Sequence, residues 1–215
     1  MFLENNIEVF SEKFEYQFTR FNVTGLIKVN QEYIDNTLKN YYMSSIFLLP
    51  LNKISNEIKE NNWIRSVNLS TNYKDTLFIF IDEYKPIGIY GYNNKLFYFD
   101  TNGKIIDEIN KNINQEKKLI VFTGPSSNLH AKSILDILNK LNFDNQYGIK
   151  AIEYINKRRW NIILNNSAIL KLSESNPKIS IENFIKIEKN LTKAEINNIK
   201  YFDLRNIYKT HITYK

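Results

Sequence analysis

Cysteine is absent from the 215-residue sequence, and histidine occurs only as His130 and His211. A chain without thiols forms no disulfide framework, iron–sulfur cluster or cysteine-ligated zinc site. Glycine is scarce, with six residues, and none lies in a GxxxxGK[ST] or GxGxxG phosphate-binding loop. The apolar runs at 46–51 and 77–81 are far shorter than the roughly 18 residues that cross a bilayer. The sequence therefore argues against thiol chemistry, nucleotide-dependent enzymes and a membrane span.

The composition that remains is that of a folded protein. Hydrophobic residues make up 43%, aromatic residues 14% and charged residues 24%, whereas a disordered chain carries fewer apolar side chains. The net charge of +6 favours anionic partners, but the lysines are scattered along the chain. Binding of single-stranded nucleic acid also needs exposed aromatic rings. We expect the aromatic residues of the most apolar strands in the core, and hence no nucleic-acid partner; these residues are Phe78, Phe80, Phe97 and Phe99.

The N-terminal part of the chain predicts an alternation of strands and helices. Apolar residues recur at helical spacing after Gln31 and again after Pro50. They alternate with polar residues in 63–69, which is typical of a half-buried strand. The segment 77–81 is apolar throughout, so we expect a strand that is covered on both faces. With a first strand at 14–23, the predicted unit is β-α-α-β-β.

The remainder of the chain predicts a mostly antiparallel β domain with flanking helices. A helix is expected after Gly124-Pro125, with its N-terminus capped by Ser126, Ser127 or Asn128. The other predicted elements are short strands at 87–92, 95–100, 104–106, 119–122, 149–155, 160–164, 168–172, 201–204 and 208–214, a helix at 181–191, and a polar loop at 110–118.

Few side chains in the sequence could support catalysis. Asp82 and Glu83 are neighbours in a predicted strand, so their carboxylates point to opposite faces and cannot flank one bond. The two serines after Pro125 lie near His130, but no Gly-x-Ser-x-Gly elbow surrounds them, and a serine before a helix is usually a cap. His211 has no second metal ligand nearby in the sequence. We therefore predict no enzymatic activity, and no catalytic, cofactor-binding or metal-binding residue.

The last strand and an arginine-rich turn are the candidate binding features. A strand that runs into the chain end often lies at a sheet edge, where unpaired main-chain groups can accept a partner strand. An edge protected by Lys209 and Lys215 fits the same pattern equally well. The cluster Lys157-Arg158-Arg159 is either a solvated hairpin turn or a dock for acidic side chains, whose carboxylates suit guanidinium groups.

Seven short segments of the chain form a recognisable series: 62–67 (NWIRSV), 75–79 (DTLFI), 82–87 (DEYKPI), 99–103 (FDTNG), 123–125 (TGP), 158–164 (RRWNIIL) and 203–205 (DLR). In order and spacing they resemble the motifs of the FtsQ/DivIB family of bacterial cell-division proteins. The family pattern includes P-W-V, D-T-L, E-x-x-P, an aspartate-and-glycine hairpin and D-L-R. The resemblance spans residues 18–213.

The resemblance implies an α+β fold in two domains. A POTRA domain is expected over 18–86 and the family's C-terminal β domain over 87–215, with 1–17 as a membrane-proximal lead-in. The family also has a cytoplasmic tail and a transmembrane helix, and this chain resembles the extracytoplasmic portion alone. The resemblance thus implies a single-pass protein of the cell inner membrane, anchored by a helix that this chain lacks, with both domains in the periplasm.

The function that the resemblance implies is a non-enzymatic scaffold of the divisome. Such proteins hold FtsB and FtsL, together with other divisome membrane proteins, and FtsB is expected to add a strand at the C-terminal edge. By motif, Arg205 is the D-L-R arginine and Arg158 matches the arginine before the Trp strand, while Asn206 stands where the family often has Tyr. The implied partner-binding residues are Arg158, Trp160, Phe202, Arg205, Asn206 and Tyr208.

Two other classes remain open at the level of sequence. A POTRA-containing periplasmic module of an outer-membrane assembly or secretion system would share the N-terminal pattern, but it should continue into further POTRA repeats. A hydrolase with an unfamiliar site is the second, and no set of residues supports it.

Overall fold

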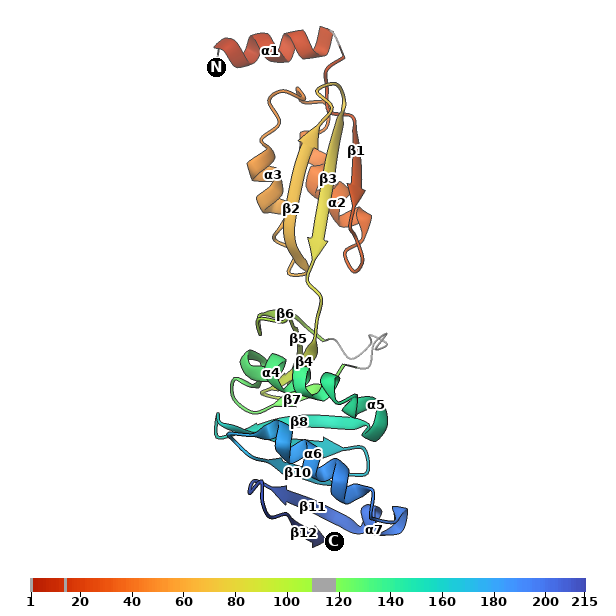
Figure 1. The fold of residues 1–215 in the computed structure, drawn as a ribbon. Coiled ribbons are helices and arrows are strands. Elements are labelled where there is room, and N and C mark those ends of the chain that lie inside the picture. Colours follow the sequence, from red (N-terminus) through yellow and green to blue (C-terminus); the bar gives the residue numbers. More distant parts are fainter. Residues whose placement is uncertain (1, 14, 110–118) are drawn as a thin grey trace. The chain divides into compact units, whose positions relative to one another are not determined.

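The computed structural model describes residues 2–13, 15–109 and 119–215. The chain divides into two compact units, Met1–Tyr84 and Lys85–Lys215 (Figure 1). Each unit is built on its own β-sheet, and helices accompany strands in both, so the α+β class predicted from the sequence is confirmed.

The first unit contains a three-stranded sheet in the order β1-β3-β2. β1 pairs with β3 in parallel, and β2 pairs with β3 antiparallel, as expected for two strands that a short turn connects. The predicted β-α-α-β-β order is confirmed, but the helix at the N-terminus was not predicted. The elements are α1 (Phe2–Lys13), β1 (Arg20–Thr24), α2 (Gln31–Leu38), the 3₁₀ helix η1 (Lys39–Tyr41), α3 (Leu51–Ile58), β2 (Ile64–Thr71) and β3 (Thr76–Glu83).

The core of this unit lies between the sheet and the helices α2 and α3. The helical spacing of the apolar residues places them on one face of each helix, and alternate residues of β3 meet them. The side chains that share this core and are at most 1% exposed include Ile34 and Leu38 of α2, Ile54 and Ile58 of α3, and Leu77, Ile79 and Ile81 of β3.

Glu83, the last residue of β3, is a buried carboxylate with a structural role. Its Oε1 accepts hydrogen bonds from the main-chain N–H groups of Ile27 and Val29 at 2.9 and 3.1 Å, and its Oε2 accepts one from Lys28 at 2.8 Å. A charged acceptor surrounded by three donors is stable when buried. Glu83 therefore fixes the loop between β1 and α2, which explains the glutamate of the E-x-x-P motif.

The other face of the first sheet is not covered by the helices of its unit. Phe78 and Phe80 of β3 are 43% and 54% exposed. The prediction that 77–81 is covered on both faces is therefore wrong, and so is the prediction that these two rings belong to the core. Of the two further aromatic residues predicted inside, Phe99 is fully buried and Phe97 is half-buried.

The second unit contains a nine-stranded sheet in the order β12-β11-β10-β9-β8-β7-β4-β5-β6. Five of its eight strand pairings are antiparallel, and three, β4–β7, β7–β8 and β10–β11, are parallel. The strands are β4 (Gly88–Tyr92), β5 (Lys95–Phe99), β6 (Ile105–Glu108), β7 (Val121–Thr123), β8 (Ile149–Ile155), β9 (Arg159–Leu164), β10 (Ile169–Leu172), β11 (Ile199–Leu204) and β12 (His211–Tyr214).

Helices α4 (Ser127–Lys140) and α6 (Pro177–Glu188) pack on one face of this sheet, with the short helices α5 (Phe143–Tyr147) and α7 (Lys193–Asn198) beside them (Figure 1). The core between the layers is rich in aromatic rings in edge-on contact, including Phe122 with Trp160 and Phe184 with Phe202. Edge-on rings interact favourably beyond the area that they bury.

The N-terminus of α4 differs from its prediction. Ser126 occupies the capping position in a left-handed conformation (φ 62°), and its side chain makes no capping hydrogen bond. Asn128 lies inside the helix, where its Nδ2 donates to the main-chain carbonyl of Gly103 at 2.6 Å. None of the predicted caps therefore acts as one, and Asn128 instead connects α4 to the turn between β5 and β6. The loop predicted at 110–118 lies outside the described residues.

Candidate protein-interaction edge

The candidate site is the β12 end of the nine-stranded sheet. β11 and β12 form an antiparallel pair in which Phe202 lies opposite Ile212 and Asp203 opposite His211. β12 is the last strand in the sheet order, and in the described part of the chain nothing pairs with its outer edge. An edge strand presents main-chain N–H and C=O groups that another strand can pair with.

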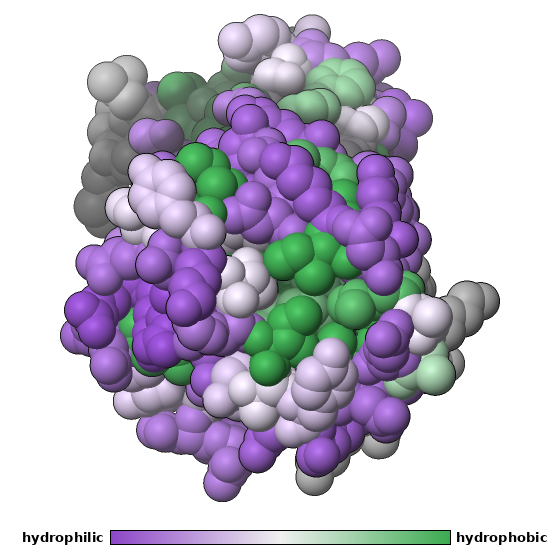
Figure 2. All heavy atoms as spheres, turned by 60° about the horizontal axis from the view of Figure 1, so that its bottom comes forward, coloured by the Kyte–Doolittle hydropathy of each residue, from purple (hydrophilic) through white to green (hydrophobic). Residues whose placement is uncertain are grey.

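The two faces of β12 differ in character. Ile212 lies on the core side, against the helices, and is half-buried, whereas His211 and Thr213 alternate to the opposite face. Figure 2, in which the end of the molecule that carries β12 comes forward, shows a cluster of hydrophobic surface framed by hydrophilic residues. A strand added at this edge would meet apolar surface on one face and polar groups on the other.

The connection from β11 to β12 carries three of the predicted partner-binding residues, Arg205, Asn206 and Tyr208. Asn206 Oδ1 accepts a hydrogen bond from the main-chain N–H of Tyr208 at 2.9 Å, which forms a local turn. This turn places the Tyr208 ring almost wholly in solvent, with 92% of the residue exposed.

Helix α6 holds this connection in place. Ser180 Oγ donates to the carbonyl of Leu204, and Asn183 Nδ2 donates to the carbonyl of Ile207, both at 2.8 Å. These two bonds satisfy main-chain acceptors where the strand pairing ends. The connection is therefore fixed at both Leu204 and Ile207, one residue before Tyr208.

Arg205 is already engaged within the chain. Its Nε donates to Asp203 Oδ1 at 2.8 Å, and its guanidinium forms an ion pair with the same carboxylate. The hydrogen bond from Arg205, together with the charges of Arg205 and Lys171, lowers the pKa of Asp203 below its usual value, and Asp203 in turn raises the pKa of Arg205. A carboxylate from a partner would have to share this guanidinium with Asp203.

Arg158 lies just before β9, beside the ends of β10 and β11 and thus on the same side as Arg205. It follows a tight turn between β8 and β9, in which Asn156 and Lys157 both have positive φ (50° and 55°), and its Nη1 lies 3.6 Å from Glu174 Oε2 after β10. Because β9, β10 and β11 are adjacent, Arg158 and Arg205 are separated by one strand, or about 10 Å. The fold thus brings together two arginines that are distant in sequence.

Trp160 and Phe202, the remaining predicted partner-binding residues, have their side chains in the core. Trp160 is 6% exposed and contacts Tyr154, with 4.3 Å between ring centroids, while Phe202 is fully buried against Phe184. Neither ring is available to a partner without unpacking the core. The structure therefore divides the predicted set into four surface residues and two core residues beneath them.

The structure also adds residues that were not named as partner-binding, namely His211, Thr213 and Tyr214 of the edge strand itself. The sequence could have indicated these residues, because it predicts a strand at 208–214 near the chain end. Lys215 Nζ donates to the carbonyl of Asn197 at 2.7 Å, so one of the two lysines that could protect the edge is instead bound to the end of α7.

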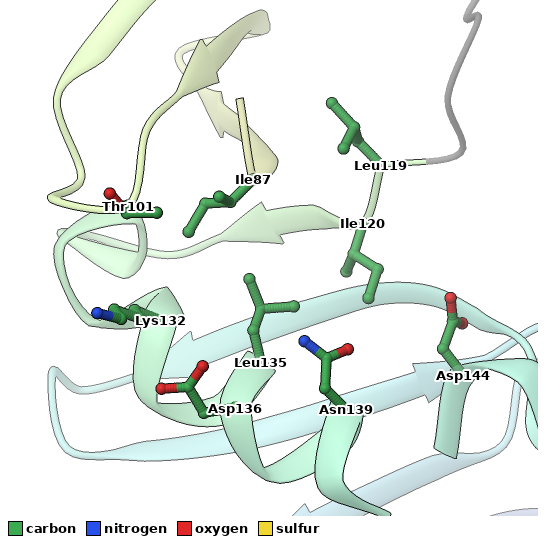
Figure 3. A pocket seen from close by; sticks show the side chains of 9 residues that line it. All are labelled: Ile87, Thr101, Leu119, Ile120, Lys132, Leu135, Asp136, Asn139 and Asp144. Carbon is green, nitrogen blue, oxygen red and sulfur yellow. The ribbon is translucent and has the colours of Figure 1, made fainter. Parts of the chain in front are cut away.

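The second unit also contains a hollow of about 360 Å³ (Figure 3). Ile87, Ile120 and Leu135 give it an apolar wall. Lys132 and Asp136 extend from neighbouring turns of α4, and Asp144 lies apart from them at the other side. In 2–13, 15–109 and 119–215, no three His, Cys, Asp or Glu side chains cluster so that they could hold a metal ion. We assign no chemistry to this hollow.

No helix among the described residues combines the length and the apolar character that a membrane span requires.

The features of the two units define a class of protein: a POTRA domain, followed by a β domain whose last strand is a sheet edge. Comparison with known families agrees. Residues 17–84 match the family described as "POTRA domain, FtsQ-type", and residues 89–205 match "Cell division protein FtsQ/DivIB, C-terminal". The chain belongs to the FtsQ/DivIB family of cell-division proteins.

Individual relatives support this assignment along nearly the whole chain. The chain is 30% identical to the cell division protein FtsQ of Rickettsia conorii and 29% identical to that of Rickettsia typhi, and each alignment covers 98% of this chain and 77% of the relative. It is 25% identical to FtsQ of Zymomonas mobilis, over 85% of this chain and 57% of that protein. The resemblance inferred from the motifs is thus confirmed.

Proposed function

We propose that the chain acts as a non-enzymatic divisome scaffold that binds a partner by pairing the partner's strand with β12. The observation that carries this proposal is that β12 ends the nine-stranded sheet, with no pairing at its outer edge in the described part of the chain. Strand addition gains affinity from main-chain hydrogen bonds and needs no catalytic group. FtsB and FtsL are the expected partners, alongside other divisome membrane proteins.

The surface residues around the edge would define register more than affinity. Arg205 and Arg158 are exposed and ion-paired, and an exposed ion pair contributes about 0.2–1 kcal/mol. Asn206 shapes the turn that presents Tyr208, whose ring can cover the apolar side chains of a partner. Trp160 and Phe202 would act indirectly, by supporting β9 and β11 from the core.

For location, we propose the periplasmic side of the cell inner membrane, with anchorage by a single transmembrane helix. The support is membership of the FtsQ/DivIB family. A role in outer-membrane assembly or secretion is not favoured, because the second unit matches the C-terminal domain of a cell-division family rather than a further POTRA repeat.

Calorimetric titration of the chain with FtsB and FtsL ectodomains tests the proposal. Successive residues of β12 direct their N–H groups alternately toward β11 and outward, so one of Ile212→Pro and Thr213→Pro removes an outward donor. We expect that variant to lose binding while its melting temperature stays close to that of the parent. Ile105→Pro, in the edge strand β6 at the opposite end of the sheet, serves as the matched control.

Two results would contradict the proposal. The first is that the parent chain binds neither ectodomain at about 100 µM. The second is that both β12 proline variants bind as tightly as the parent, because main-chain pairing at this edge would then play no part.

A further inference from the structure

The open face of the first sheet carries two aromatic rings in its central strand. Phe78 and Phe80 are i and i+2 in β3, so they lie on the same face, opposite to the face that α2 and α3 cover. They are 43% and 54% exposed. An exposed pair of aromatic rings at the centre of a sheet is costly to leave in water and therefore suggests a binding role.

Both rings are flanked on each side by uncharged hydrogen-bonding side chains. Phe78 lies between Asn22 of β1 and Ser70 of β2, and Phe80 lies between Thr24 and Asn68. All four polar residues are exposed, and no side-chain hydrogen bond of theirs is found within the described ranges. Two amides and two hydroxyls are thus free to donate to and accept from a ligand.

These side chains line a shallow hollow of about 230 Å³ that contains no charged residue. The nearest charges on this sheet pair with one another beyond its two ends. Arg20 forms an ion pair with Asp75 at one end, and Arg65 forms one with Asp82 at the other. The hollow is therefore a neutral strip, in a chain whose net charge is +6.

We propose that this face binds a neutral polysaccharide chain. The face of an aromatic ring carries partial negative charge and attracts the C–H groups on the apolar side of a sugar ring. The hydroxyl and acetamido groups at the rim of the sugar match the amides of Asn22 and Asn68 and the hydroxyls of Thr24 and Ser70. Two rings at i and i+2, with polar groups on both flanks, suit an extended chain of sugars better than a compact ligand.

The composition of the hollow argues against other occupants. An anionic membrane surface would call for lysine or arginine in the hollow, and none lines it. A second copy of the chain packed face to face would need a contiguous apolar patch, but here polar residues flank both rings. The neutral polysaccharide is the occupant whose chemistry uses both the rings and the polar residues.

Titration of the isotopically labelled 215-residue chain with chitotetraose and cellotetraose, followed by NMR, tests this proposal. We expect shifts of the Asn22 and Asn68 side-chain amides, and an affinity that does not change with ionic strength. Phe78→Ala and Phe80→Ala should each weaken binding about three- to tenfold. Both side chains are exposed, so these variants should keep the melting temperature of the parent.

Control variants separate this face from other exposed aromatic residues and from the β12 edge. Tyr92→Ala, which removes a ring that is 53% exposed in the second unit, should leave the affinity for the oligosaccharides unchanged. The Thr213→Pro variant should also bind them as the parent does.

The proposal would be overturned if neither oligosaccharide shifted any resonance at about 10 mM, if both phenylalanine variants bound the oligosaccharides as tightly as the parent, or if binding required anionic sugars. Two other results would show a different occupant and would also overturn it. One is a dimer, seen by sedimentation, that Phe80→Ala abolishes; the other is binding to anionic lipid vesicles that Phe80→Ala abolishes.

Discussion

The two open β-surfaces of the molecule differ in what they offer to a ligand. The β12 edge offers main-chain groups, and its basic side chains are His211 in the strand and, in the connection before it, Lys209 and Arg205, which is paired with Asp203. The open face of the first sheet offers side chains, two rings and four neutral polar groups, while its nearest charges are paired. The edge is thus suited to a polypeptide with acidic residues, and the face to a neutral ligand.

The difference teaches that a net charge of +6 says little about any one surface. Binding at the edge should weaken as salt rises, because screening acts on exposed charges. Binding at the face should be insensitive to salt.

Phe202→Ala should destabilise the second unit by about 3–5 kcal/mol, because it leaves a cavity among fully buried rings beneath β11. Chemical denaturation with a probe in each unit measures this. Loss of partner binding should track loss of folding, and oligosaccharide binding should persist at denaturant concentrations where the first unit remains folded. Intact stability with lost partner binding would show instead that the Phe202 ring contacts the partner directly.

Glu83→Ala should destabilise the first unit by about 3 kcal/mol, because three main-chain N–H groups, of which that of Val29 is buried, lose a charged acceptor. The exposed Glu60→Ala is the matched control and should change stability little. Hydrogen exchange of the Ile27, Lys28 and Val29 amides provides the local measurement. A stability equal to that of the parent would mean that water replaces the carboxylate at no cost.

Arg205→Glu should weaken binding of an acidic partner about tenfold and remove part of its salt dependence, because a favourable charge becomes a repulsive one. Arg65→Glu is a close match, since Arg65 is also an exposed arginine paired with an aspartate in a strand, but it lies in the first unit. Titration at two ionic strengths measures both variants. An equal loss of affinity in the two would indicate a general effect of net charge and not a site at the edge.

The smallest expected effect is a loss of folding stability at low pH. Hydrogen bonding from Arg205 lowers the pKa of Asp203, and hydrogen bonds from Thr76 and Asn72 lower the pKa of Asp75. A carboxyl whose pKa is lower in the folded state than its ordinary value of 3.8 stabilises the folded state at every pH above 3.8. This stabilisation is lost as the pH falls through the pKa of the folded state. Both units should therefore lose stability in acid.

The two carboxyls should respond differently to salt. Because an arginine is the main cause for Asp203 and neutral donors are the main cause for Asp75, salt should diminish the contribution of Asp203 more. Unfolding of Asp203→Asn and Asp75→Asn from pH 6 to pH 3, at low and high salt, measures this. Equal responses to salt would contradict the assignment of these causes.

Hydrophobic periodicity predicted the strands and helices of both sheets well, but not what lies on each face. The run Leu77-Phe78-Ile79-Phe80-Ile81 is apolar at every position, so its pattern fits a strand covered on both faces as well as one with exposed rings. Which of the two arrangements forms depends on whether a second layer covers the outer face of the sheet, and that is a property of the whole unit. The open face could therefore not be predicted from the strand alone.

At the candidate site, the edge position of the last strand could be predicted from the sequence. Whether an individual aromatic ring faces the core could also have been predicted. Trp160 alternates with Ile162 and Leu164, which marks an inward-facing row, although the motif alone suggested a contact residue. The helix between β10 and β11 signalled a parallel crossover that an antiparallel meander does not allow. The grouping of Arg158 with Arg205, in contrast, depends on the sheet order.

The bonds from α6 to the connection before β12 have a consequence for genetics. Ser180 and Asn183 lie outside the edge strand, yet they fix the start and end points of the segment that displays Tyr208. Alanine at either position would free that segment and raise the entropy lost when a partner docks. Genetic screens for defective septation should therefore find substitutions in α6, although the substituted residues do not contact the partner.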